Sequence, residues 1–163
     1  MNLVHVDHSS LPPFLPEKAR ILILGSFPSV ESRRQGFYYA HPSNRFFPVL
    51  AAALGFPEPR GIMERKALLE KEGIALYDVV YSCDIEKSKD ETIENVVPID
   101  LEAILEGRGI KRIFTTGKKA ESLFRKAFSI DFTPLPSTSS ANARMGKEKL
   151  VQVYRKEILP FLR

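Results

Sequence analysis

The stretch ARILILGSFPS, residues 19–29, holds four consecutive large aliphatic residues and then breaks into glycine, serine and proline. A short apolar run without polar alternation is typical of a strand that is buried on both faces of a parallel sheet. Gly25 and Pro28 end the run and predict a tight loop at the carboxyl end of this strand. The turn is no nucleotide-binding fingerprint, because it has neither the GxGxxG spacing nor a GK(S/T) phosphate loop.

Strands and helices alternate along the rest of the chain, which predicts an α/β domain with a mostly parallel sheet covered on both faces. No repeat or linker divides the sequence, so we expect a single domain over residues 1–163. The proline-rich residues 1–18 are expected to wrap the surface, the polar residues 83–95 to form an exposed loop, and Ser43 to cap a helix. Further strands are expected at 74–82, 110–117 and 131–137, and helices at 43–55, 63–73, 98–109, 118–128 and 147–162.

Composition and charge limit the functions that the chain can have. It has 163 residues, 44% of them hydrophobic, and its single cysteine, Cys83, excludes an internal disulfide and a four-cysteine metal site. The three histidines lack paired ligand spacing, so we expect no structural metal. No apolar run reaches the length of a membrane span and the N-terminus lacks the order of a signal peptide, which favours a cytoplasmic location.

The positive charge gathers in one part of the chain. Residues 1–107 hold 11 lysines and arginines against 16 acidic residues, whereas residues 108–163 hold 13 against 4. A basic half is the footprint expected of a protein that meets phosphates. A solvated basic surface is the alternative interpretation of the same charges.

Four unusual loops follow the expected strands: residues 25–44, 82–92, 115–120 and 135–144. Ligands of parallel α/β sheets bind beyond the carboxyl ends of the strands, so these loops are expected to converge on one cleft.

Two of the loops have a chemistry of their own. GFYYAHPSNRFF, residues 36–47, combines aromatic rings with an amide, which would suit a pocket for a flat base or, alternatively, core rings beside a helix cap. LPSTSSANAR, residues 135–144, offers small hydroxyls and backbone N–H groups that suit phosphate oxygens, or forms an ordinary serine-rich turn.

In this order, LGSFPS, YYAHPSNRFFPVL, GIALYDVV, IFTTGKKA and LPSTSSANAR resemble the uracil-DNA glycosylase superfamily, and within it the hypoxanthine-DNA (deoxyinosine) glycosylases. The matching segments span residues 22–144. The resemblance implies a three-layer α/β/α sandwich with a short central sheet. It also implies a monofunctional glycosylase that flips a deaminated base, hypoxanthine or uracil, out of DNA and hydrolyses its glycosidic bond without metal or cofactor. We expect a monomer, the usual state of such a domain.

The resemblance also implies roles for individual residues. Asn44 is expected to activate water through its side-chain amide, with His41 as a second catalytic candidate. Phe46 is expected to stack on the base, with Tyr39 as the competing ring. The rest of the base pocket is expected at Gly25, Ser26, Phe27, Pro28, Ser29 and Thr116. The DNA backbone is expected to meet Ser137, Thr138, Ser139, Ser140, Asn142, Arg144 and Lys147.

The chain departs from the superfamily in its first motif, which reads Ser26-Phe27-Pro28 where many members carry Asp or Asn. Activation of water must then come from elsewhere. Asp78 is a candidate base, but its expected role is structural, at the end of a strand. A weakly active or inactive DNA-binding member of the fold and a hydrolase of small nucleosides are the alternatives to a glycosylase, and the basic half argues against the second.

Overall fold

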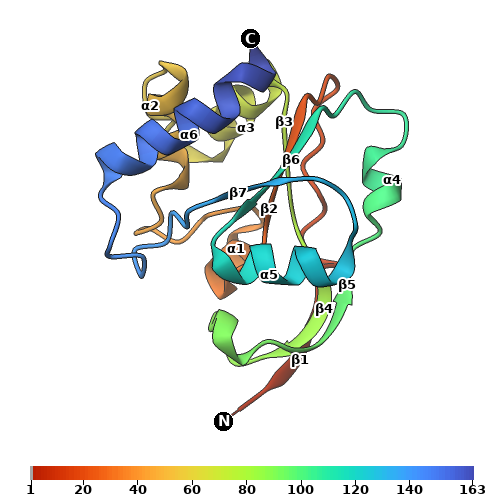
Figure 1. Ribbon diagram of the computed structural model, residues 1–163. Helices are drawn as coiled ribbons and strands as arrows, with labels where there is room; N and C mark the ends of the chain where they lie inside the picture. Colours follow the sequence, from red (N-terminus) through yellow and green to blue (C-terminus); the bar gives the residue numbers. More distant parts are fainter. Residues whose placement is uncertain (1) are drawn as a thin grey trace.

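A four-stranded parallel sheet forms the centre of the computed structural model, which describes residues 2–163 (Figure 1). The strands stand in the order β3-β2-β6-β7, and Ile21 of β2 lies opposite Ile74 of β3 and Arg112 of β6. The aliphatic residues 21–24 have no exposed surface, as expected for a strand covered on both faces. The strands are β2 (Ile21–Gly25), β3 (Ile74–Asp78), β6 (Arg112–Thr116) and β7 (Thr133–Leu135).

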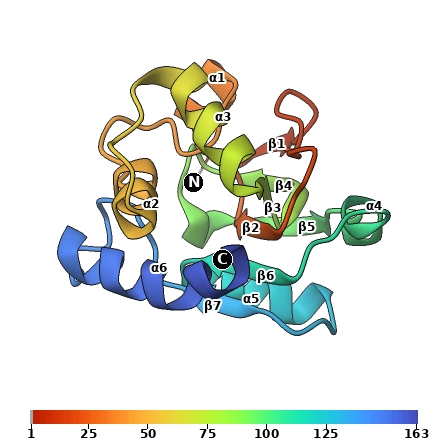
Figure 2. The ribbon, with the colours of Figure 1, turned by 90° about the horizontal axis from the view of Figure 1, so that it is seen from above.

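Helices cover both faces of this sheet. Seen from above, α1 and α3 lie on one side of it and α5 and α6 on the other, while α2 packs against α6 (Figure 2). The predicted three-layer α/β/α sandwich is therefore confirmed. The helices are α1 (Val30–Gln35), α2 (Phe46–Leu54), α3 (Gly61–Glu72), α4 (Leu101–Leu105), α5 (Lys118–Ala127) and α6 (Lys147–Leu162).

A second, antiparallel sheet of order β1-β4-β5 lies below the first in Figure 1, and the sequence does not predict it. The single strand expected at 74–82 is wrong, because β3 ends at Asp78 and the residues from Val80 onward form a separate strand of the antiparallel sheet. The exposed loop expected at 83–95 is also wrong. Its polar residues belong to strands with one solvated face and to a short 3₁₀ turn. These elements are β1 (Val4–Asp7), β4 (Val80–Ile85), η1 (Asp90–Thr92) and β5 (Glu94–Pro98).

Two expectations at the ends of elements also change. Helix α2 begins at Phe46 rather than near Ser43, and the side chain of Asn44, not of Ser43, accepts a hydrogen bond from the N–H of Phe46 at 2.8 Å. Residues 2–18, the described part of this segment, do more than wrap the surface, because they contribute β1 and bury Leu11 against the core.

The four parallel strands end at one edge of the sheet, at Gly25, Asp78, Thr116 and Leu135. This edge is where an α/β sheet binds ligands. Among the helices of residues 2–163, none is long and apolar enough to span a bilayer.

Candidate active site

A cleft of about 260 Å³ opens at the carboxyl edge of the parallel sheet. All four predicted loops contribute side chains to it, so their expected convergence is confirmed. The expected site residues that line it are Gly25, Ser26, Phe27, Pro28, Ser29, Tyr39, His41, Asn44, Thr116, Ser137, Thr138, Ser139 and Ser140. Phe46, Asn142, Arg144 and Lys147 do not line it.

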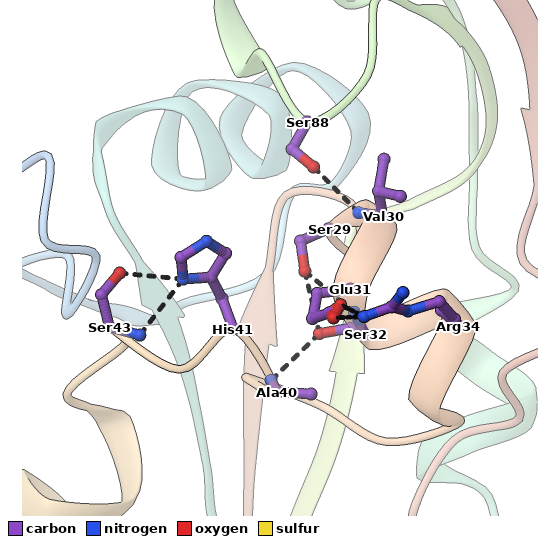
Figure 3. A network of polar contacts seen from close by, with 9 residues as sticks. All are labelled: Ser29, Val30, Glu31, Ser32, Arg34, Ala40, His41, Ser43 and Ser88. Atoms are coloured by element: carbon purple, nitrogen blue, oxygen red, sulfur yellow. Dashed lines mark hydrogen bonds and ion pairs between the residues drawn. The ribbon is translucent and has the colours of Figure 1, made fainter.

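The loop after β2 is held from several sides. A Cβ atom on residue 25 would lie 2.5 Å from Oδ1 of Asp78, so glycine is needed for the close approach of β2 and β3. Ser29 caps α1, because its hydroxyl accepts from the N–H of Ser32 at 3.0 Å (Figure 3). The hydroxyl of Ser88 accepts from the N–H of Val30 at 2.8 Å and ties the η1 loop to the start of the same helix.

Asn44 is half-buried in the cleft, and its amide oxygen is already occupied. Oδ1 accepts from the N–H of Phe46 at 2.8 Å and from the hydroxyl of Thr138 at 2.9 Å. A carbonyl oxygen has two lone pairs, so these two donors saturate it. This corrects the expectation that the oxygen accepts a proton of the attacking water. The Nδ2 group has no hydrogen-bond partner within residues 2–163 and is the atom left to meet a ligand.

His41 is exposed at the rim, and its tautomer follows from its neighbours (Figure 3). Its Nδ1 lies 3.2 Å from the backbone nitrogen and 2.8 Å from the hydroxyl of Ser43. Because a backbone N–H can only donate, Nδ1 is the acceptor, and neutral His41 carries its proton on Nε2. His41 can therefore donate a hydrogen bond to a ligand in the cleft.

The expectation that Phe46 stacks on a base is wrong. Phe46 is fully buried and lies behind Tyr39, with ring centroids 3.9 Å apart and planes 9° apart. Tyr39 is the ring that reaches the cleft, and its hydroxyl lies 3.2 Å from Oγ1 of Thr116. Burial raises the pKa of Tyr39, so this hydroxyl stays protonated at neutral pH. Its φ of 53° is uncommon for a bulky residue, a backbone state that often accompanies functional sites.

The serine-rich loop is shaped by Arg45, which the sequence does not single out. The half-buried guanidinium of Arg45 donates to four carbonyl oxygens of this loop. The acceptors are Thr138 at 3.3 Å, Ser139 at 2.9 Å, Asn142 at 3.1 Å and Met145 at 2.6 Å. One side chain thus fixes most of the loop's course across the edge of the cleft.

The hydroxyls of this loop differ in what they can contact. Ser137 and Ser139 each accept from a backbone N–H, at 3.1 and 3.2 Å, which leaves the hydroxyl proton of each free to donate to a phosphate. Thr138 is buried and gives its proton to Asn44, so its expected contact with phosphate is wrong. Asn142 donates to the carbonyl of Ser137 at 2.9 Å and shapes the loop.

A buried ion pair closes the floor of the cleft. Asp78 hydrogen-bonds a side chain and not the backbone, because its Oδ2 lies 2.8 Å from Nε2 of His8. Nδ1 of His8 lies 2.6 Å from the carbonyl of Leu11 and must donate to it, so the second proton is shared between His8 and Asp78. Burial alone would lower the pKa of His8, but the hydrogen bond and charge of Asp78 raise it above 6.5. Nothing in the sequence around His8 signals this role.

Asp90 is a second acidic residue of the cleft that the sequence does not single out. It lies in η1, and its Oδ2 accepts from the hydroxyl of Ser26 at 2.8 Å. The only signal in the sequence is that the loop 82–92 follows a strand. Within residues 2–163, no group of three or more His, Cys, Asp and Glu side chains is arranged to hold a metal ion.

Known proteins resemble this chain in sequence and in fold. The profile of the uracil DNA glycosylase superfamily matches residues 12–163. The chain belongs to this superfamily. It is an enzyme, a DNA glycosylase, and the expected family is confirmed.

Two relatives and one solved structure are similar over most of the chain. A protein of Methanosarcina acetivorans, named hypoxanthine DNA glycosylase, is 34% identical over 143 residues, 85% of this chain and 90% of its own. A protein of Methanosarcina barkeri with the same name is 32% identical over 144 residues, with the same two shares. The solution NMR structure of a candidate uracil DNA glycosylase from M. acetivorans superposes with a TM-score of 0.73 at 31% identity, over 90% of this chain and 95% of that one.

Proposed function

We propose that this DNA glycosylase removes deaminated bases from DNA, with hypoxanthine as the preferred base and uracil as the second. The observation that carries the proposal is the junction of two loops that lie 94 residues apart. Asn44 accepts from Thr138 at 2.9 Å, and the hydroxyls of Ser43 and Ser140 lie 2.9 Å apart. A base in the cleft would face Asn44 while its flanking phosphates meet the serine-rich loop. The names of the two Methanosarcina relatives support hypoxanthine as the base.

The target nucleotide would be flipped out of the duplex, since the glycosidic bond cannot be reached within the stack. The flipped base would lie over the loop that follows β2 and stack on Tyr39, which takes the place first expected for Phe46. The close approach of Gly25 to Asp78 leaves backbone and carboxylate atoms at the floor, where the edge of a base can be hydrogen-bonded.

Cleavage of the glycosidic bond leaves positive charge on the sugar and negative charge on the departing base. Donors that are already in place for this negative charge lower the barrier, and loss of one such donor typically costs about 100- to 1,000-fold in rate. Asn44 supplies an N–H of its side-chain amide, and His41 supplies Nε2–H. Both are held by hydrogen bonds on their other polar atom, so little reorganisation is needed during the reaction.

The duplex would be gripped on the serine-rich side of the cleft. The free hydroxyl protons of Ser137 and Ser139 point to phosphate contacts, and the exposed Arg144 and Lys147 add positive charge nearby. We also propose that the protein acts on DNA as a monomer.

The test is an incubation with duplexes that carry a single deoxyinosine, deoxyuridine or deoxyxanthosine, followed by alkali. Alkali-sensitive sites at the lesion, and none in the undamaged duplex, are the expected result, with deoxyinosine cleaved fastest. The rate should be the same with EDTA. Salt-dependent binding of all four duplexes without any alkali-sensitive site would identify an inactive DNA-binding protein instead.

The role of Asn44 is tested by two variants. Asn44→Ala should lower the rate of base release by about 100- to 1,000-fold, whereas the Kd for DNA changes little. Asn44→Asp keeps an oxygen for Phe46 and Thr138 but removes the Nδ2 donor, so it should be equally slow. Wild-type rates in Asn44→Asp would show that the oxygen, and not the N–H group, is the reacting atom.

A further inference from the structure

Hydrolysis of a glycosidic bond releases a proton from the attacking water, and the Asn44 side chain has no free atom to accept it. Its oxygen is saturated by two protein donors. The ionisable side chains that line the cleft are Tyr38, Tyr39, His41, Asp78 and Asp90. The base must be one of these five if a side chain performs this role.

The other four side chains are less suited to accept this proton. Burial raises the pKa of Tyr38 and of Tyr39, so both hydroxyls keep their protons. Neutral His41 has its Nδ1 lone pair directed at Ser43 and a proton on Nε2. Asp78 is buried, and its Oδ2 is paired with His8 at 2.8 Å, which makes it a part of the floor held by an ion pair.

Asp90 is more exposed than Asp78, the other carboxylate of the cleft. It is half-buried, and only its Oδ2 is engaged, by the hydroxyl of Ser26 at 2.8 Å. Within residues 2–163, its Oδ1 receives no hydrogen bond. The carboxylate therefore has one oxygen that is held and one that is free to meet a water molecule in the cleft.

The loop that carries Asp90 is fixed at both ends. The hydroxyl of Thr92 donates to the carbonyl of Lys89 at 2.7 Å and accepts from the N–H of Glu86 at 2.9 Å. On the other side, Ser88 accepts from the N–H of Val30 at the start of α1 (Figure 3). Asp90 is thus presented to the cleft by a rigid turn, as a catalytic group requires.

We propose that Asp90 is the general base of the reaction and that Ser26 is the residue that orients its carboxylate. This inference rests on the proposed glycosylase activity. The water oxygen forms a bond to the anomeric carbon of the sugar while the bond from that carbon to the base breaks. The bonding electrons leave with the base, and the water proton passes to Oδ1 of Asp90. That proton then goes to the departed base, so the products are an abasic sugar and a neutral base.

The surroundings of Asp90 suit this role. Burial raises its pKa, the hydrogen bond from Ser26 lowers it in part, and the charges of Asp78 and Glu91 raise it further while Lys119 lowers it. A carboxylate with a raised pKa is a stronger base when it is ionised. His41 is the remaining titratable group that faces the same cleft.

The experiment measures single-turnover release from a deoxyinosine duplex between pH 4.5 and 9, with the Kd for DNA determined in parallel. The wild-type rate should rise with pH through the pKa of Asp90 and then level off. Asp90→Asn should lose this rise and be about 100- to 10,000-fold slower at the plateau, with a Kd within about twofold. Ser26→Ala should shift the rise to higher pH, because the hydroxyl lowers the pKa of Asp90. The control is Glu94→Gln, which removes one negative charge, as Asp90→Asn does, but from an exposed position on β5. Its rate and pH profile should match those of the wild type.

A second variant guards against a folding defect. Asp90→Ala should regain part of its rate when formate is added, since a small carboxylate can fill the gap and accept the proton. An Asp90→Asn variant that binds DNA and retains the wild-type rate and pH profile would overturn the assignment of the base while leaving the glycosylase activity standing. No release by the wild type from any lesion would overturn the glycosylase proposal and this inference together.

Discussion

Replacement of Arg45 by methionine tests whether one side chain organises the serine-rich edge of the cleft. Its guanidinium makes four hydrogen bonds to loop carbonyls, at 2.6 to 3.3 Å. Hydrogen bonds to charged groups contribute about 1.5–3 kcal/mol each, so the four would give at least about 6 kcal/mol if nothing replaced them. The loop is half-exposed and can relax into water, and a loss of about 3 kcal/mol in the free energy of unfolding is therefore expected.

This loss of stability should be visible in the Tm, in amide hydrogen exchange and in a conservative variant. For a domain of this size, about 3 kcal/mol lowers the Tm by about 9 °C. Amide hydrogen exchange should speed up chiefly in residues 137–145, by about a hundredfold if the loop opens independently. Arg45→Lys should fall between wild type and Arg45→Met, because one ammonium cannot reach all four carbonyls.

Arg144→Met is the matched control, since it removes the same charge from the exposed side of the same loop. It should change the free energy of unfolding by less than about 0.5 kcal/mol and weaken only the binding of DNA. Arg45→Met with wild-type Tm and wild-type exchange in the loop would refute the idea that this residue holds the loop in place.

Three further predictions follow from other contacts. Gly25→Ala should lower the free energy of unfolding by about 1–3 kcal/mol, because the added Cβ would lie 2.5 Å from Oδ1 of Asp78. It should also slow base release. Chemical denaturation measures the first effect and alkali cleavage the second. The pKa of His8 is raised, so its contribution to stability is full below pH 6.5 and is lost as the pH rises through the higher folded value; the Tm of Asp78→Asn should lack this decline. Tyr154→Phe leaves the carbonyl of Pro136 without its 2.7 Å donor and should cost about 1–3 kcal/mol in urea denaturation, with a cost near zero as the contrary result.

The central sheet could be predicted because its strands are apolar on both faces. The run at residues 21–24 has no polar position, so it could belong only to a covered strand. The order of strands and helices then left little freedom for the topology. The second sheet escaped prediction because β5 is exposed at most positions, and its composition resembles that of a loop.

The location of the site could be predicted from the sequence, but the contacts within it could not. The ends of parallel strands meet at one edge, which brought Asn44 and Ser137 to the same cleft. The predicted role of Phe46 was wrong because the sequence does not show which of the two stacked rings, Tyr39 or Phe46, faces the cleft and which is buried behind it. His8 and Asp90 come from segments whose positions depend on the second sheet, so no local pattern could reveal them.

The most direct test of the whole account is the detection of the free base by mass spectrometry after a single turnover on a deoxyinosine duplex. We expect one equivalent of hypoxanthine per abasic site with the wild type, and a rate reduced by about two orders of magnitude or more with Asn44→Ala. Release of hypoxanthine at the same rate by both proteins, or binding without any free base, would contradict the claim that these two loops form a site for hydrolysis of the glycosidic bond.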